Sequence, residues 1–256
     1  SKGNVLDPID LIDGISLEEL LEKRTQGMMQ PELASKIKKQ TEKEFSNGIP
    51  PFGTDALRLT FTALASFGRD IKFDLKRVEG YRNFCNKLWN ASRFVLMKLE
   101  SRSINFDATL STPDNWILSR LQHTKIAVEK HLSDYRLDLM SQTLYEFVWH
   151  DYCDWYLELS KPLLDNNETR PGCEATLIKV LSETLTLLHP IIPFITEEIF
   201  EQCRSLNNDK SERLITKPYP EIDETLISKK SESEIAWLQE FILGIRQIRG
   251  EMNIEP

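Results

Sequence analysis

Apolar residues recur every three or four positions along most of this chain, which is the spacing of one face of an α-helix. The clearest case begins at Asp74, after which the apolar positions 75, 78, 81, 85, 88, 95 and 99 fall on a single helical stripe. Similar runs predict helices over about 54–68, 112–131, 134–162 and 177–188, and another from Pro193. Long helices joined by short connections are typical of an up-down bundle, so the chain is predicted to be mainly α.

The bundle pattern covers residues 53–205, and the segments on either side of it differ. Residues 1–52 are predicted to form a small mixed connector with two short amphipathic helices, around 16–25 and 31–45. Residues 206–256 begin with a polar loop and an extended stretch containing two prolines, and they end in a helix from about Ser231 to Arg249. The sequence therefore predicts three parts, divided near residues 52 and 205.

Composition narrows the class of protein. Hydrophobic residues make up 40% of the chain, enough for a sizeable core, and no apolar run approaches the roughly 20 residues that span a bilayer. We therefore expect a soluble, cytoplasmic protein without a membrane partner. The four cysteines form no CxxC pair and have no histidine at zinc-finger spacing, so we expect buried free thiols and no metal site.

Charge is distributed unevenly along the chain. The net charge is -8, yet the segment from Ala56 to Lys98 contains nine Lys or Arg residues against three acids, which gives +6 there and -14 elsewhere. A local basic patch on an acidic body can still bind an RNA backbone. The charge pattern therefore makes the helix predicted from Asp74 the first candidate for a binding surface.

That helix, from Asp74 to Leu99, has an unusual polar face. Opposite its apolar stripe lie amides and cations three or four apart, with one acid at the start: Glu79, Asn83, Asn86, Lys87, Asn90 and Arg93. A solvated face usually mixes Glu with Lys, and exposed Asn lowers helix propensity.

Amides and cations of this kind suit RNA, because amides can read base edges, cations bind phosphates and an aromatic ring can stack on a base. We predict RNA contacts at Asn83, Lys87, Asn90 and Arg93, with Phe94 as a candidate stacking surface. A plain solvated face, and a core position for Phe94, are the alternatives.

Other polar motifs favour structural roles. Arg69, in a turn between two helices, is a candidate phosphate contact, and a local ion pair is the alternative. Asp55 suits the first turn of a helix, and Arg58 is expected to be an internal ion-pair partner. His189 is expected to cap a helix end. The sequence contains no Gly-rich phosphate loop and no nucleophile–base constellation, so no catalytic residue is predicted.

Five stretches of the chain resemble, in order, the valyl-tRNA synthetases of the bacterial type, which are class I aminoacyl-tRNA synthetases. They are SKGNVLDPIDLIDGISLEELLEKRT, GTDALRLTFTALASFGRDIKFDLKRVEGYRNFCNKLWNASRFVL, YEFVWHDYCDWYLELSKP, HPIIPFITEEIF and IRGEMNIEP. The pieces DALR and HPIIPFITEE alone indicate only the class I group for Val, Ile, Leu and Met. The block Gly80–Leu96 and the SKGNVLDPID start point to the valyl member.

The resemblance implies a role for each part of the chain. Residues 1–52 would hold the end of the KMSKS loop, with Ser1 and Lys2 as its remaining residues, followed by a connector that contacts the tRNA stem. Residues 53–205 would be the helical anticodon-binding domain, with the helix from Asp74 facing the anticodon loop. Residues 206–256 would be its C-terminal cover, before a coiled-coil arm. The catalytic and editing domains of the same parent chain would lie upstream.

The resemblance also implies an activity for the parent enzyme rather than for this fragment. The parent would attach valine to tRNA(Val) with ATP and Mg²⁺, through valyl-adenylate. The fragment alone is expected to bind tRNA weakly and to be inactive, with no catalytic residue, no cofactor of its own and no DNA partner. Two alternatives stay open: a helical protein-interaction module without RNA binding, and the equivalent domain of an isoleucyl or leucyl synthetase.

Overall fold

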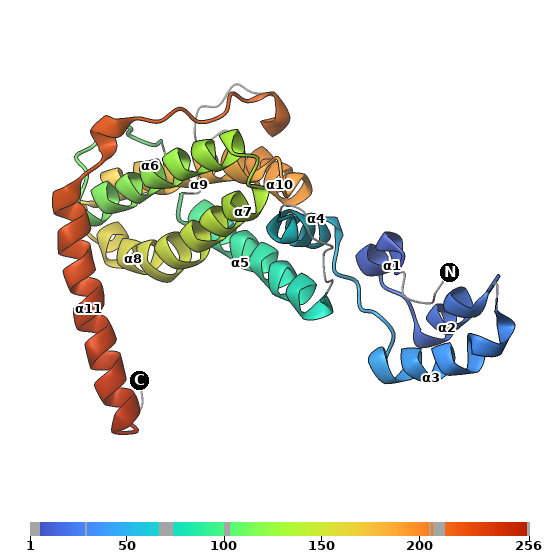
Figure 1. Cartoon of the computed structure of the whole chain (residues 1–256). Coiled ribbons are helices and arrows are strands. Elements are labelled where there is room, and N and C mark those ends of the chain that lie inside the picture. Colours follow the sequence, from blue (N-terminus) through green and yellow to red (C-terminus); the bar gives the residue numbers. More distant parts are fainter. Residues whose placement is uncertain are drawn as a thin grey trace.

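The computed structural model describes residues 6–28, 30–66, 74–99, 103–204, 206 and 213–254, and most of these are helical (Figure 1). Within these ranges there is no β-strand, and only two isolated β-bridges occur, Ile15 with Ile49 and Ser46 with Gly48. The prediction of a mainly α fold is confirmed. None of the described helices is long and apolar enough to cross a membrane.

The N-terminal region forms a small helical unit beside the bundle: α1 (Pro8–Asp13), α2 (Leu17–Thr25), the 3-10 turn η1 (Pro31–Leu33) and α3 (Ala34–Glu44). The predicted capping box opens α2, because Ser16 Oγ accepts the Glu19 N–H at 3.3 Å and the Glu19 carboxylate accepts the Ser16 N–H at 3.2 Å. A separate apolar cluster joins Leu20 and Phe45 of this unit to Leu57 and Val78 of the bundle.

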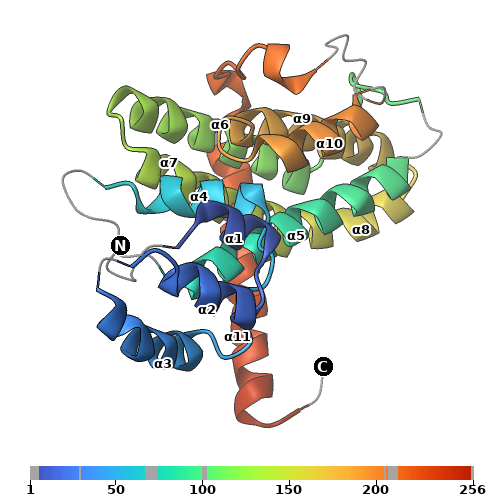
Figure 2. The same cartoon turned by 90° about the vertical axis from the view of Figure 1, so that its right-hand side faces the viewer.

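The bundle itself consists of α4 (Thr54–Leu64), α5 (Leu75–Leu99), α6 (Thr112–Ser133), α7 (Leu137–Glu146), η2 (Phe147–Tyr156), α8 (Leu157–Asp165), α9 (Arg170–Leu188) and α10 (Pro193–Cys203) (Figure 2). Helix α9 is its centre, with 15 of 19 residues buried. It begins seven residues earlier than predicted. Near this start Gly172 lies against the Thr109 backbone, where an added Cβ would come within 2.3 Å of the carbonyl oxygen.

The run from α7 to α8 contains a ten-residue π-helix, η2, that the apolar spacing does not predict. The predicted stop at Pro162 is wrong, since α8 continues to Asp165. Proline removes one backbone donor from the helix. The carbonyl that loses this donor belongs to Glu158, which lies on the exposed side of the helix and can be solvated.

Helix α4 is attached to the junction of α9 and α10 by Asp55. Its buried carboxylate accepts the N–H groups of Phe194 at 3.3 Å and Ile195 at 2.7 Å, at the start of α10. Asp55 therefore stabilises the positive end of a helix distant in sequence. Burial raises the pKa of this carboxyl, although both hydrogen bonds lower it.

Arg58 completes the same junction from α4. Its guanidinium donates to the carbonyl oxygens of Ile191 at 2.9 Å and Pro190 at 3.0 Å. Arg58 therefore bonds to backbone carbonyls of the loop after α9 rather than forming the predicted close ion pair, although its charge still lowers the pKa of Asp55. His189 does cap α9 as predicted: its N–H donates to Leu185 O at 3.0 Å, and its ring Nδ1 lies 2.9 Å from Thr196 Oγ1.

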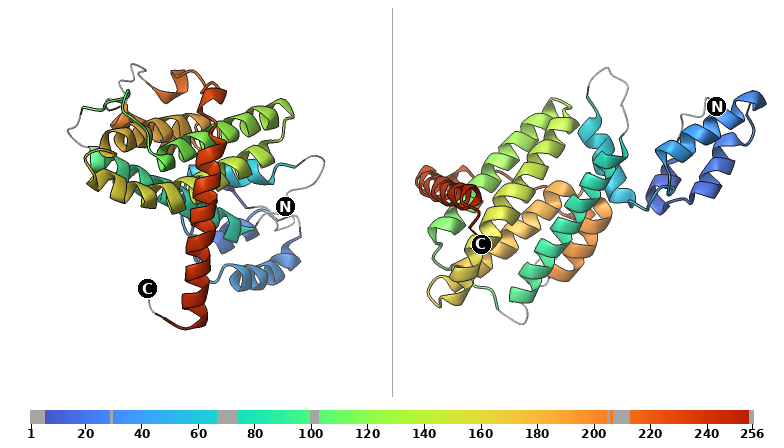
Figure 3. Two further views of the ribbon diagram at one scale, coloured as in Figure 1. Left: turned by 90° about the vertical axis from the view of Figure 1, so that its left-hand side faces the viewer. Right: turned by 90° about the horizontal axis from the view of Figure 1, so that it is seen from below.

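The C-terminal segment crosses the bundle and ends in a long helix. It comprises the 3-10 turns η3 (Leu214–Thr216) and η4 (Glu224–Leu226) and the helix α11 (Lys229–Glu251). Buried Lys125 of α6 holds the segment between η3 and η4, because its Nζ donates a hydrogen bond to the Glu221 carbonyl oxygen at 2.9 Å. Figures 1 and 3 show that α11 and the N-terminal unit lie at opposite ends of the bundle.

Candidate nucleic-acid interface

The outer face of α5 presents a row of exposed polar side chains. Asn83, Asn86, Asn90 and Arg93 are all exposed, and none of the four makes a side-chain hydrogen bond or ion pair within the described part of the chain. The opposite face of the helix buries Phe84, Leu88, Val95 and Leu99 in the core. The four side chains, which we call the polar row, are therefore available to an external partner.

Lys87 belongs to this face by spacing but is engaged within the bundle. Its Nζ lies 2.5 Å from Asp154 Oδ1 and 3.8 Å from the centre of the Trp149 ring, both on η2. His150 Nδ1 lies 3.3 Å from the other oxygen of Asp154. A phosphate would have to compete with these contacts, so Lys87 contributes less charge to the surface than the sequence predicts.

Phe94 is half-buried at the edge of the polar row. Its ring packs against the core, and Lys98 Nζ lies 5.9 Å from the ring centre. The residue as a whole stays partly exposed, and it follows exposed Arg93 in the chain. Both interpretations of Phe94 are thus partly met, and its role in stacking stays a prediction. Ser1, Lys2 and Arg69 lie outside the described residues.

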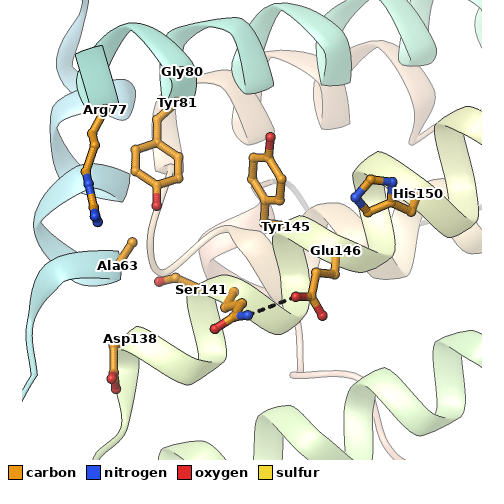
Figure 4. Close-up of a pocket in the computed structure, with 10 residues that line it drawn as sticks. Ala63, Arg77, Gly80, Tyr81, Asp138, Ser141, Tyr145, Glu146 and His150 are labelled. Atoms are coloured by element: carbon orange, nitrogen blue, oxygen red, sulfur yellow. Dashed lines mark hydrogen bonds between the residues drawn. The ribbon is translucent and has the colours of Figure 1, made fainter. Parts of the chain in front are cut away.

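An open groove of about 540 Å³ lies next to the N-terminal half of α5, between α4, α5 and α7. In Figure 4, Arg77 and Tyr81 extend from α5 towards α7, and Tyr145 extends the opposite way. Asp138, Glu146 and His150 line the same groove, and the Gln142 amide donates to the Glu146 carboxylate at 2.9 Å. The groove is thus lined by Arg77 and His150 together with Asp138 and Glu146. The two carboxylates do not favour the binding of a strongly anionic ligand there. The polar row is the better candidate for RNA.

An aromatic column forms one wall of the groove. The Tyr145 ring stacks on Phe84 at 5.0 Å and on Trp149 at 5.4 Å, and it meets Tyr81 edge-on at 6.2 Å. Burial raises the pKa of both tyrosine hydroxyls, which keeps them protonated near neutral pH. The column anchors α5 to α7 and η2, and so holds the polar row on a rigid helix.

Sequence reasoning missed this groove because its residues come from helices about 60 positions apart. One local signal was present: Gly80 interrupts a good helix sequence, and a Cβ added there would meet nothing within 4 Å. No close packing therefore requires this glycine, although glycine lowers helix stability. Gly80 lines the groove, and the absence of a side chain at this position leaves the groove wider.

The described residues offer neither a metal site nor a reactive thiol. No group of three His, Cys, Asp or Glu side chains gathers there in a way that could hold a metal ion. Three of the four cysteines, Cys85, Cys173 and Cys203, are buried, and Cys153 is half-buried. Burial raises the pKa of Cys85, Cys153 and Cys173 to about 12, so these thiols are poor nucleophiles at neutral pH.

Comparison with known proteins identifies the family. Residues 114–256, more than half of the chain, match the family described as anticodon-binding domain of tRNA ligase. The chain belongs to this family. The match begins after α5, so the polar row lies outside it.

A curated relative covers the polar row as well. The valine–tRNA ligase of Psychrobacter arcticus (strain DSM 17307 / VKM B-2377 / 273-4) is 52% identical over 267 aligned positions, which include 99% of this chain. The chain spans 27% of that relative's length. The resemblance to valyl-tRNA synthetases is confirmed.

A solved structure shares the fold. It is the LeuRS of Agrobacterium radiobacter K84, in a ternary complex with tRNA and LeuAMS. The match covers 69% of this chain and 20% of the LeuRS chain, with a TM-score of 0.52 and 17% sequence identity. At this identity the likeness concerns the fold alone, and it agrees with a helical bundle of the class I synthetases.

Proposed function

We propose that this chain is the anticodon-binding part of a valine–tRNA ligase and that it binds tRNA(Val) through the polar row of α5. The observation that carries the proposal is the row itself, in which three amides and a guanidinium stand exposed without partners in the described bundle. Amides can hydrogen-bond to unpaired bases, and the guanidinium can bind the phosphates between them.

The three predicted parts follow from this role. Residues 1–52 would connect the bundle to the catalytic domain, residues 53–205 would recognise the anticodon, and residues 206–256 would cover the bundle. The junction of Asp55 and Arg58 with the loop before α10 supports a fixed placement of α4 and α5, since both side chains bridge segments over 130 residues apart.

The longer enzyme would attach valine to tRNA(Val), with ATP and Mg²⁺ bound by its catalytic domain. The remaining loop residues Ser1 and Lys2 would lie at the edge of that chemistry. The described residues of this chain are assigned no catalytic step. Their contribution would be to hold the tRNA by its anticodon, and so to orient its acceptor end.

Filter binding over a salt series tests the proposal. The 256-residue chain should bind tRNA(Val) more tightly than a non-cognate tRNA of equal length. With Arg69, Lys87 and Arg93 each binding one phosphate, and a slope of roughly -0.7 per contact, log K should fall by about 2 for each tenfold rise in salt. Binding that does not change with salt, or that is equal for both tRNAs, would refute the proposal.

A further inference from the structure

Helix α11 carries a stripe of exposed apolar side chains that runs from Trp237 to Met252. Its members, spaced 4, 4, 3 and 4 residues apart, fall on one helical face: Trp237, Phe241, Ile245, Ile248 and Met252. Their exposed fractions are 66%, 55%, 43%, 56% and 65%. The Trp237 and Phe241 rings stack at 5.6 Å, so the stripe presents one continuous surface.

The other face of α11 is the one that the bundle holds. Ser231 and Ile235 are buried there, and Glu232 accepts a hydrogen bond from Ser119 Oγ of α6 at 2.6 Å. Further along, the Arg246 guanidinium lies 5.7 Å from the Trp155 ring centre. Figures 1 and 3 show the C-terminal half of α11 extending past the bundle. The first part of the helix is thus anchored to the bundle, whereas the apolar stripe from Trp237 onwards stays exposed.

We propose that the apolar stripe of α11 is an internal interface of a longer ligase, covered by an apolar face of a segment outside these 256 residues. The inference rests on the proposed membership in a longer ligase and not on tRNA binding. Contiguous exposed apolar surface of this kind marks an interaction site. The 52% identical relative has nearly three quarters of its length outside the region that matches this chain, and could supply such a segment.

The size of the stripe favours a partner in the same polypeptide. A stable interface between separate molecules usually buries about 800 Å² and 20–30 residues on each side, and this stripe offers five side chains on one helix. Within one chain the linker raises the effective concentration to the millimolar range, so a small face can remain covered. A second copy of the chain is therefore the weaker candidate.

Charge disfavours RNA and membrane surfaces as the occupant. By helical spacing, the exposed Glu240 and Glu251 border one side of the stripe and Arg249 borders the other, so the edges of the stripe have no excess of basic residues. Carboxylates repel phosphates, and an interfacial membrane helix usually has a polar face rich in Lys and Arg. An apolar protein face with a basic edge fits this surface best.

Thiol labelling tests the inference directly. Ile248→Cys places a thiol on the stripe, and Gln247→Cys places one beside it on an exposed part of the helix. The native thiols give a slow background, because burial raises the pKa of three of them to about 12 and the fourth, Cys203, is buried. Rates with a maleimide are compared in the 256-residue chain and in the full-length ligase, without tRNA.

We expect both thiols to react rapidly in the 256-residue chain, and only Ile248→Cys to react at least tenfold more slowly in the full-length ligase. Met252→Cys, at the end of the helix, should repeat the result if Ile248→Cys disturbs folding. Equal rates for the stripe and control thiols in the full-length ligase would overturn the inference. So would protection that appears only with added tRNA, or protection in the 256-residue chain that rises with protein concentration. The comparison of the two chains is made without tRNA, so failure of tRNA binding leaves it unaffected, and added tRNA enters only as a separate control.

Discussion

Asp55 shows how one side chain holds the candidate interface in place. Its carboxylate satisfies two of the backbone N–H groups that open α10, and no other residue of α4 reaches them in the described structure. A helix start buried without an acceptor is costly. Since α5 follows α4 and packs against it, Asp55 supports the placement of the polar row without being part of it.

Asp55→Ala should lower the free energy of unfolding by about 1–3 kcal/mol, because it leaves buried donors without an acceptor. Asp55→Asn should cost less, since the amide oxygen still accepts one hydrogen bond and the buried site disfavours a charge. Urea denaturation of both variants measures the difference, with Glu129→Ala at an exposed position of α6 as the control. Equal loss in the alanine and asparagine variants would contradict this role.

Lys87 and Arg93 mark what helical spacing can and cannot predict at this scale. Spacing places both on the outer face of α5, and Arg93 is indeed exposed there. Lys87 instead pairs with Asp154, a residue 67 positions later. Periodicity within one helix predicts which way a side chain points, but it contains no information about which distant helix lies beside it.

At the scale of elements, two glycines in helices have opposite reasons to be there. Gly172 of α9 lies against the Thr109 backbone, where an added Cβ would be 2.3 Å from the carbonyl oxygen. Gly80 of α5 borders the open groove, and a Cβ there would meet nothing within 4 Å. The first glycine is required by packing, and the second is not.

Gly80→Ala should raise the free energy of unfolding by roughly 0.4–1 kcal/mol, because alanine restricts the unfolded chain and favours the helix. Gly172→Ala should lower it by more than 1 kcal/mol, because α9 would have to move away from the backbone it contacts. Thermal or urea unfolding of the two single variants provides the comparison. A shift of the same sign in both variants would contradict the packing described here.

The elements that the sequence predicts well are those with one apolar face. Helix α5 has a clear stripe and begins one residue from its predicted start. Helix α9 is buried on almost all sides, so its apolar positions have no single period and its start at Arg170 is missed. The π-helical turn of η2 is missed as well, since its wider turn depends on packing against neighbouring helices rather than on local spacing.

The whole molecule separates three surfaces. The N-terminal unit lies at one end of the bundle and α11, which carries the apolar stripe, lies at the other (Figures 1 and 3). The polar row lies on the outer face of α5. This arrangement suits a module within a longer enzyme, in which two surfaces contact other parts of the chain and one contacts RNA. Only the polar row and the general fold were predictable from the sequence. The groove and the exposed stripe depend on how the helices assemble.

The central claim is that the polar row binds the anticodon loop of tRNA(Val). The most direct measurement is the affinity of Arg93→Ala for tRNA(Val), with Lys130→Ala, at an exposed position of α6, as the matched control.

Loss of a charged hydrogen bond to phosphate typically costs about 1.5 kcal/mol, so Arg93→Ala should weaken binding roughly tenfold. It should also reduce the salt slope by about 0.7. Helix content by circular dichroism should not change, and Lys130→Ala should bind within about twofold of the parent chain. If Arg93→Ala binds tRNA(Val) as tightly as the parent chain does, the polar row is not the anticodon contact.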